Sequence, residues 1–382
     1  MIAAGLGSSF WIGLLSAILS GVATVLVFRL FESLGQTRAM IGAASFAFTP
    51  MVFLASVSAM DTIWGAVFFL AATLCLLHHR IWWCSLFLGL AIASRPTYVL
   101  AVIPLILLYV KFEPRRLGNL ATWRRLLPAG ILAGVVAAVF FAPAVISLRA
   151  RILEVAPVGE NRWIRAAYLA SVELFGVLGF FAVCAAAASA LIRRRDVHAS
   201  QFRASDRWAF TLIAIWGALF LALPHDSAYL LPALIGLYWL LCEYASSISL
   251  SVMAVVLALS CFVLRIDVGG VSVAGPAFWN IELQEQRTCV GRLVAAKLRS
   301  NPQYYVIAGF LKPQVIAEAG QPLSDRVLYA VRQRADGQLL DTELVPISSQ
   351  AELWVIDQVA EQQNSIWRDT SLTSHVIVTN EC

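Results

Sequence analysis

Apolar residues run in long, nearly unbroken stretches along the first 265 residues, and polar residues become frequent after that point. A backbone in hydrocarbon must satisfy its own hydrogen bonds, so stretches of this kind fold as helices when they cross a membrane. The pattern predicts ten spans: Phe10–Phe31, Ala39–Ser58, Thr62–Leu77, Ile81–Ser94, Thr97–Tyr109, Leu127–Leu148, Leu169–Ile192, Ala209–Leu223, Tyr229–Cys242 and Leu250–Leu264. We therefore expect a polytopic, all-α membrane bundle over residues 1–265.

Two neighbouring stretches are short for a bilayer core of ~30 Å. They are Ile81–Ser94 and Thr97–Tyr109, and Pro96 lies between them. Proline lacks a backbone donor and disfavours helix at the residue before it. The pair is therefore either two helices or one broken element.

The tail, residues 266–382, has a mixed polar and apolar pattern. An amphipathic helix is expected over Ile281–Arg299, and further helices over Lys312–Ala319 and Gln358–Asn364. Short apolar runs read as strands, and these are Tyr304–Ala308, Val327–Val331, Leu353–Ile356 and His375–Val378. The tail is predicted to be a small α/β domain.

Composition supports the membrane interpretation. Hydrophobic residues make up 60% of the chain and charged residues 13%, about half the charged share of a soluble domain. The net charge of +5 is accounted for by basic loops between spans and does not call for nucleic acid.

Arginine and lysine fall unevenly between the two sets of loops. One set holds Arg38, Arg80, Lys111, Arg115, Arg116, Arg124, Arg125, Arg193, Arg194, Arg195, Arg203 and Arg207; the other holds Arg95, Arg149, Arg151, Arg162 and Arg165. The positive-inside rule assigns the first set to the cytoplasm. Ten spans then leave both termini and the α/β tail outside. An external N-terminus suggests that a preceding helix is missing from this chain.

Ionisable residues of both signs collect at the predicted outer ends of the spans. Asp61 precedes the third span, Arg95 ends the fourth, Glu173 lies inside the seventh, and His225 with Asp226 forms a turn after the eighth. Charges beside hydrocarbon are costly and are therefore candidates for function. Ordinary polarity of loops between spans is the alternative explanation.

Several motifs, taken in order, carry a resemblance to a known family. A span ends in Phe28-Arg29-Leu30-Phe31, a small-residue helix ends at Thr49-Pro50, and Asp61 opens the next helix. The segment GLAIASRPTYVLAVIPLILLYV places Arg95 at a basic position, and Leu223-Pro224-His225 is followed by Tyr229-Leu230-Leu231-Pro232. This order resembles the GT-C superfamily of polyprenyl-phosphate-sugar glycosyltransferases, which includes bacterial aminoarabinose transferases and relatives of protein O-mannosyltransferases.

The chain departs from the family pattern in two places. Family members begin with one more helix and a long outer loop that carries the first acidic residue. Ser227 and Ala228 stand where an arginine would precede Tyr229.

The resemblance implies a multi-pass protein of the bacterial inner membrane that moves a sugar from a polyprenyl-phosphate donor to an acceptor at the outer face. Asp61 would orient the acceptor or bind a divalent metal. Arg95, His225 and Tyr229 would face the donor phosphate, where positive charge stabilises the transition state. Glu173 matches no motif of the family and is a second candidate acid only because it lies inside a span. A structural ion pair with an arginine such as Arg149 is an equally good explanation, and Arg149 is also a candidate phosphate ligand.

Seven cysteines are present, and the five in or beside spans are expected to be packing residues. Cys289 and Cys382 are the two in the tail, where an oxidising compartment permits a disulfide between them.

Two other functions stay open at this stage: a transporter or flippase of a lipid-linked substrate, and a non-catalytic subunit of a glycosyltransferase complex. Transporters place ionisable groups near the bilayer midplane, whereas here these groups lie at predicted span ends. The sequence leaves the sugar, the acceptor and the oligomeric state open.

Overall fold

The computed structural model describes residues 9–57, 62–113, 115, 118–148, 162–194, 203–224, 226–267, 270–274, 276–328, 331–333, 339–341, 352–356 and 375–377. The chain divides into two compact units, Ile12–Phe278 and Trp279–Cys382, the latter with Met1–Trp11. The first unit is built from helices and one β-hairpin, and the second contains a small sheet.

The helical unit contains most of the long apolar stretches. Its helices are α2 (Ser9–Ser33), α3 (Ala39–Ala47), α4 (Pro50–Val57), α5 (Thr62–Leu77), α6 (Ile81–Ser94), α7 (Val102–Tyr109), α9 (Leu120–Leu148), α10 (Arg162–Tyr168), α11 (Val177–Arg194), α12 (Ala204–Ala222), α13 (Leu231–Tyr244) and α14 (Ser247–Ser260). Shorter turns are the 3₁₀ helices η1 (Pro96–Ala101) and η5 (Ser227–Leu230) and the π-helix η3 (Leu169–Glu173).

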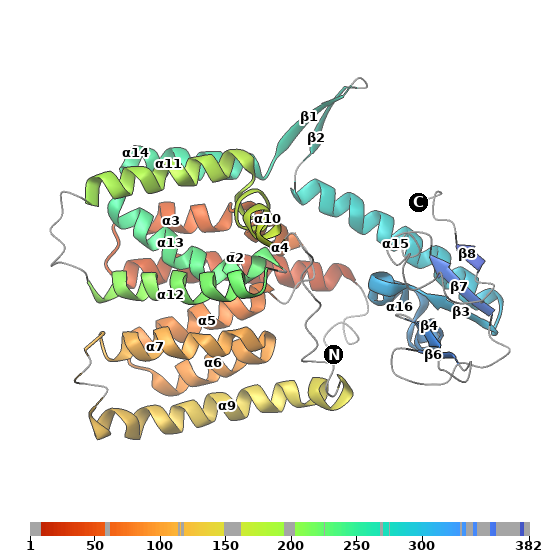
Figure 1. Ribbon diagram of the computed structural model, residues 1–382, viewed down its shortest axis with the longest axis horizontal. Coiled ribbons are helices and arrows are strands. Elements are labelled where there is room, and N and C mark those ends of the chain that lie inside the picture. The colour runs from red at the N-terminus through yellow and green to blue at the C-terminus, as the bar shows by residue number, and fades with distance from the viewer. Residues whose placement is uncertain are drawn as a thin grey trace. The chain divides into compact units, whose positions relative to one another are not determined.

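These helices pack in a definite order. The pair α11 and α14 packs on α3 and α13; α13 packs on α12; α12 contacts α7; and α5, α6 and α9 follow on the far side. Figure 1 shows this succession from α14 down to α9. Bulky aromatic side chains fill the centre, and the largest fully buried ones include Trp208, Trp216, Trp239, Tyr238 and Phe69.

Among the described residues, three helices are long and apolar enough to cross a membrane: Leu14–Ser33, Leu120–Ala142 and Ser227–Tyr244. The number rises to five if each of two bent helix pairs is one span. The other apolar helices have 10–17 residues, and at 1.5 Å per residue they are shorter than a ~30 Å core. Helices able to span a membrane are therefore present, while the number ten stays a prediction.

Two of the predicted spans are broken helices. The stretch 39–58 contains α3 and α4, which meet at 65°, because Pro50 cannot donate to the preceding turn. The stretch 169–192 begins as the π-helix η3 and bends by 87° before α11. Gly176 has φ +70° at this bend, a conformation that glycine adopts without strain. The backbone of Gly176 therefore makes the bend.

Pro96 separates two helices, which is one of the two alternatives that the sequence predicted. Helix α6 ends at Ser94, Arg95 is extended with φ −145° and ψ 117°, and η1 starts at Pro96 and leads into α7.

The second unit contains a parallel four-stranded sheet in the order β4-β3-β7-β8. Its strands are β3 (Tyr304–Ile307), β4 (Val327–Leu328), β7 (Glu352–Ile356) and β8 (His375–Ile377), and its helices are α15 (Pro276–Ser300) and α16 (Lys312–Ala319), with the 3₁₀ turns η6 (Gly309–Leu311) and η7 (Gln321–Arg326). Parallel strands require crossovers, and α16 with η7 connects β3 to β4. The four predicted strand regions thus contain strands, and Lys312–Ala319 is a helix as expected. The expected helix over Gln358–Asn364 lies outside the described residues.

The apolar faces of α15 and α16 cover the sheet. Val290, Val294 and Leu298 of α15 are fully buried against Val306 of the central strand β3. The spacing of four residues along α15 places these side chains on one stripe, which confirms an amphipathic helix there.

Two antiparallel hairpins complete the structure. They are β1 (Val263–Asp267) with β2 (Gly270–Ala274), and β5 (Val331–Gln333) with β6 (Leu339–Asp341). The first was not predicted: helix α14 ends at Ser260, and the residues assigned to the end of the tenth span begin a strand.

Candidate functional site

One short turn, residues 226–230, organises the candidate site. Asp226 is extended, and its Oδ1 accepts the backbone N–H of Ala228 at 2.8 Å. This bond caps η5, in the way that aspartate caps helix starts. Pro232 then occupies the second position of α13, where its missing N–H has no consequence. The turn therefore presents residues 226–229 at the N-terminal end of α13.

Arg95 reaches this turn from the end of α6. Its Nη2 lies 3.3 Å from Asp226 Oδ2, and its guanidinium carbon lies 5.7 Å from the centre of the Tyr229 ring. The Arg95 side chain is 16% exposed and that of Asp226 40%. Proline at position 96 forces Arg95 out of the helix, and this extended residue points a cation at the turn. Arg95 thus combines an ion pair with a cation–π contact, each stronger away from water.

Glu173 reaches the same turn from η3. Its Oε1 accepts the hydroxyl hydrogen of Ser227 at 2.6 Å. Ser227 is buried and Glu173 is exposed, so the hydrogen bond joins the interior of the turn to an accessible carboxylate. A π-helical turn is rare and is frequent at functional sites.

A small apolar cluster lies under the turn. Ala166, Leu169 and Phe220 are buried together, and Tyr229 packs against them. Arg162 of α10 donates to the carbonyl oxygens of Leu221 and Ala222, the latter at 2.8 Å. These carbonyls end α12, where a cation is favourable.

The structure brings together three of the residues that the sequence singled out. Arg95, Glu173 and Tyr229 come from separate helices and meet around residues 226 and 227, which bind Arg95 and Glu173 respectively. Asp61, Arg149 and His225 lie outside the described residues. In the described part of the chain, an arginine and a glutamate from separate helices therefore lie at the same turn.

Sequence reasoning placed Asp226 in a polar turn but gave it no role, and it treated Ser227 only as a departure from a family pattern. A capping signal was available, since aspartate three residues after Leu223 and shortly before a Pro-started helix is typical of a helix beginning. The partners of both residues could not be found from this signal.

No group of three or more His, Cys, Asp or Glu residues that could hold a metal occurs among the described residues. Asp61, the candidate metal ligand, lies outside them, so the metal stays an open expectation.

Cys289 is disulfide-bonded, while Cys75, Cys84, Cys184, Cys242 and Cys261 are free. The expected partner, Cys382, lies outside the described residues, and the pairing of the two stays a prediction.

No family model, curated protein or solved structure matches this chain. The resemblance to polyprenyl-phosphate-sugar glycosyltransferases therefore rests on the sequence motifs.

Proposed function

We propose that this chain is a multi-pass membrane protein, and that it transfers a sugar from a polyprenyl-phosphate donor at the end of the bundle where Arg95 and Glu173 lie. The observation that carries the proposal is that consecutive residues of one turn, Asp226 and Ser227, hold a guanidinium and a carboxylate from two other helices. Phosphate recognition and proton transfer need these two groups close together.

Exposed apolar stripes support the membrane part of the proposal. On α9, Leu127, Ile131, Val135 and Val139 recur at every fourth residue and are 53–67% exposed. Only 11% of the apolar window of this helix is buried. Apolar surface of this extent is uncommon on a soluble monomer and is the expected surface towards lipid.

The chemistry assigned to the site is a single displacement. A carboxylate, Glu173 or Asp61, takes the proton of the acceptor hydroxyl as its oxygen attacks the anomeric carbon. The bond from that carbon to the phosphate oxygen breaks, and polyprenyl phosphate leaves with the electron pair. A guanidinium offers five N–H donors in a planar fork, so Arg95 would stabilise the phosphate beside, or in exchange for, Asp226. His225 and Arg149 remain candidates for the same phosphate, and the proposal assigns this end of the bundle to the outer face of a bacterial inner membrane.

The experiment measures release of polyprenyl phosphate by purified, reconstituted protein supplied with lipid-linked sugars one at a time. We expect Arg95→Gln and Glu173→Gln each to reduce the rate by roughly 10²–10³-fold, the usual effect of removing one transition-state contact. Arg29→Gln is the control, because Arg29 is an exposed arginine paired within its own helix to Glu32. Wild-type rates in both site variants would refute the site assignment.

A flippase is the second candidate, and the broken helices favour it. Transporters bind substrates where helices are interrupted, and Glu173 ends a π-turn just before an 87° bend. Movement of a lipid-linked sugar across vesicles without release of polyprenyl phosphate would support this function. Absence of both activities in the isolated chain, with activity restored by a partner protein, would support a subunit.

A further inference from the structure

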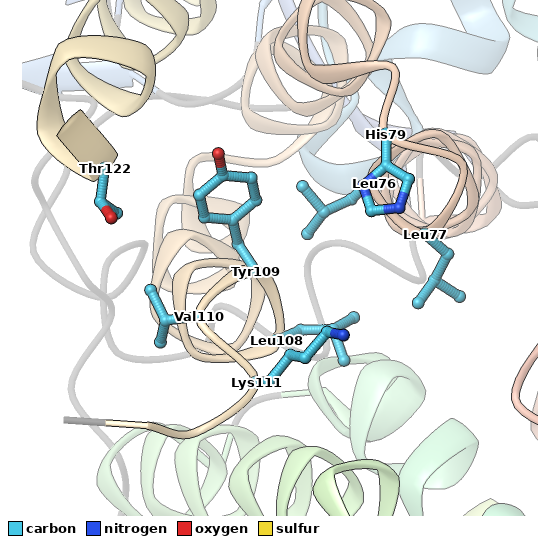
Figure 2. A pocket seen from close by; sticks show the side chains of 8 residues that line it. All are labelled: Leu76, Leu77, His79, Leu108, Tyr109, Val110, Lys111 and Thr122. Atoms are coloured by element: carbon cyan, nitrogen blue, oxygen red, sulfur yellow. The ribbon is translucent and has the colours of Figure 1, made fainter. Parts of the chain in front are cut away.

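A second group of charged residues surrounds two adjoining pockets, at the ends of α5 and α7 and the start of α9. Figure 2 shows the first pocket, where Leu108, Tyr109 and Lys111 lie across from the end of α5, with Thr122 contributed by α9. Its volume is about 450 Å³. Helices α5 and α6 are antiparallel neighbours joined by a short turn, so this is the opposite end of α6 from Arg95.

The second pocket is more basic and has a volume of about 570 Å³. Its lining includes Arg80, Arg124 and Arg125 with Trp82 and Trp83, and it shares His79 with the first pocket. Neither lining contains an acidic residue among those the structure describes, and the nearest acid along the chain, Glu113, belongs to neither. Three guanidinium groups therefore share one hollow, and the described residues of its wall include no carboxylate.

Local backbone geometry places the first of these arginines, Arg80. His79 adopts φ 59° and closes α5, since its N–H bonds to Leu76 O at 3.0 Å and the N–H of Arg80 bonds to Cys75 O at 2.8 Å. This pair of bonds is the Schellman arrangement that ends a helix. It sets Arg80 at the turn into α6.

The packing of α9 on α6 brings the other two arginines to the same pocket. Gly89 of α6 lies against Ala133, whose carbonyl oxygen would be 2.7 Å from a Cβ at position 89. Contact this close holds the two helices together, and Arg124 and Arg125 line the same pocket as Trp82 and Trp83.

Basic residues at one end of a membrane bundle are expected even without a ligand, so charge alone does not identify a binding site. Two further observations indicate one. Trp82 and Trp83 are 58% and 55% exposed, as amphipathic rings at a bilayer interface are. The apolar stripe of α9 begins at Leu127, next to Pro128 of the pocket wall, and continues away from it through Ile131 and Val135.

We propose that the second pocket binds an acidic glycerophospholipid. The phosphodiester would accept hydrogen bonds from Arg80, Arg124 and Arg125, and the acyl chains would follow the exposed stripe of α9. Basic pockets between membrane helices bind anionic headgroups in this way. The proposal rests on the membrane placement made above, but not on sugar transfer.

The test compares thermal unfolding of the purified full-length protein in neutral detergent with three additions: phosphatidylglycerol, phosphatidylcholine with the same acyl chains, and glycerol phosphate. Ligand bound to the folded state raises the melting temperature. We expect phosphatidylglycerol to raise it by roughly 2–4 °C and the other two to leave it unchanged.

Variants then test whether the rise in melting temperature depends on the arginines of the second pocket. We expect Arg124→Gln with Arg125→Gln to lose the shift, and Arg124→Lys with Arg125→Lys to keep most of it. Arg29→Gln with Arg207→Gln removes the same charge from exposed positions outside the pocket and should keep all of it. If phosphatidylglycerol raised the melting temperature equally in every variant, the lipid would not bind at these arginines and the proposed site would be wrong. If glycerol phosphate raised the melting temperature as much as phosphatidylglycerol, the ligand would be a free phosphate and not a lipid. Failure of sugar transfer would alter neither result.

Discussion

Asp206 is the most buried acid among the described residues, and its environment explains why it is tolerated there. Its carboxylate accepts hydrogen bonds from Trp239 Nε1 at 3.2 Å, Tyr244 Oη at 2.8 Å and the backbone N–H of Arg203 at 3.2 Å. The side chain is 1% exposed. A buried charge is stable only when its acceptor sites are filled by donors, and here α13 and the start of α12 supply them.

We predict that Asp206→Asn lowers the free energy of unfolding by about 2–4 kcal/mol, because the amide group turns a donor towards other donors. The measurement is chemical or thermal unfolding in detergent. Glu32→Gln is the matched control, since Glu32 pairs with exposed Arg29 in its own helix and such a pair contributes less than about 1 kcal/mol. A loss equal to that of the control would contradict the role given to Asp206.

At the scale of helices, α12 and α13 approach closely because Gly236 has no side chain. A Cβ at position 236 would lie 2.5 Å from the carbonyl oxygen of Ala209. The obstacle is backbone of the facing helix, which cannot rotate away as a side chain can. This contact also aligns α13, and the turn at its N-terminal end holds Arg95.

We predict that Gly236→Ala destabilises the protein by roughly 1–3 kcal/mol through overpacking. Gly217→Ala, in the middle of α12, is the control, because nothing lies within 4 Å of its added Cβ. The control should be neutral or more stable by about 0.5–1 kcal/mol, since alanine is the better helix former. Unfolding curves of the two variants give the comparison, and similar values for both would refute the packing argument.

At the scale of the helical unit, charge is divided between its two ends. Arg95, Glu173 and Asp226 lie at one end, and Arg80, Arg124 and Arg125 at the other. In Figure 1 the start of α9 and the start of α12 lie at the left of this unit, and the end of α9 at the right. A bilayer crossed by this unit would therefore separate the two groups.

We predict that the ends label from opposite sides of the membrane. Trp163→Cys, at an exposed position of α10, should react with an impermeant maleimide in intact spheroplasts, and Gly118→Cys, exposed before α9, only after permeabilisation. The parent for both carries Cys184→Ala, because Cys184 is a free, exposed thiol, and its own labelling sets the background. Reaction of both positions from the same side would contradict the predicted topology.

The apolar stretches by themselves located most of the helices of the described residues. The helix at Lys312–Ala319 and the strands β3 and β7 lie where they were expected, because hydrophobic periodicity is a local signal. Arg95 and Tyr229 were also found from motifs, and Glu173 from its position inside an apolar stretch.

Only the tertiary structure decided what these residues meet. Arg95 pairs with Asp226 across 131 positions, and Glu173 bonds to Ser227 across 54. It also decided that two expected spans bend at Pro50 and Gly176, and that arginines from two loops share one pocket. Such contacts depend on how whole helices pack, and helix packing is set by shape at many positions at once, which a local pattern of apolar and polar residues does not contain.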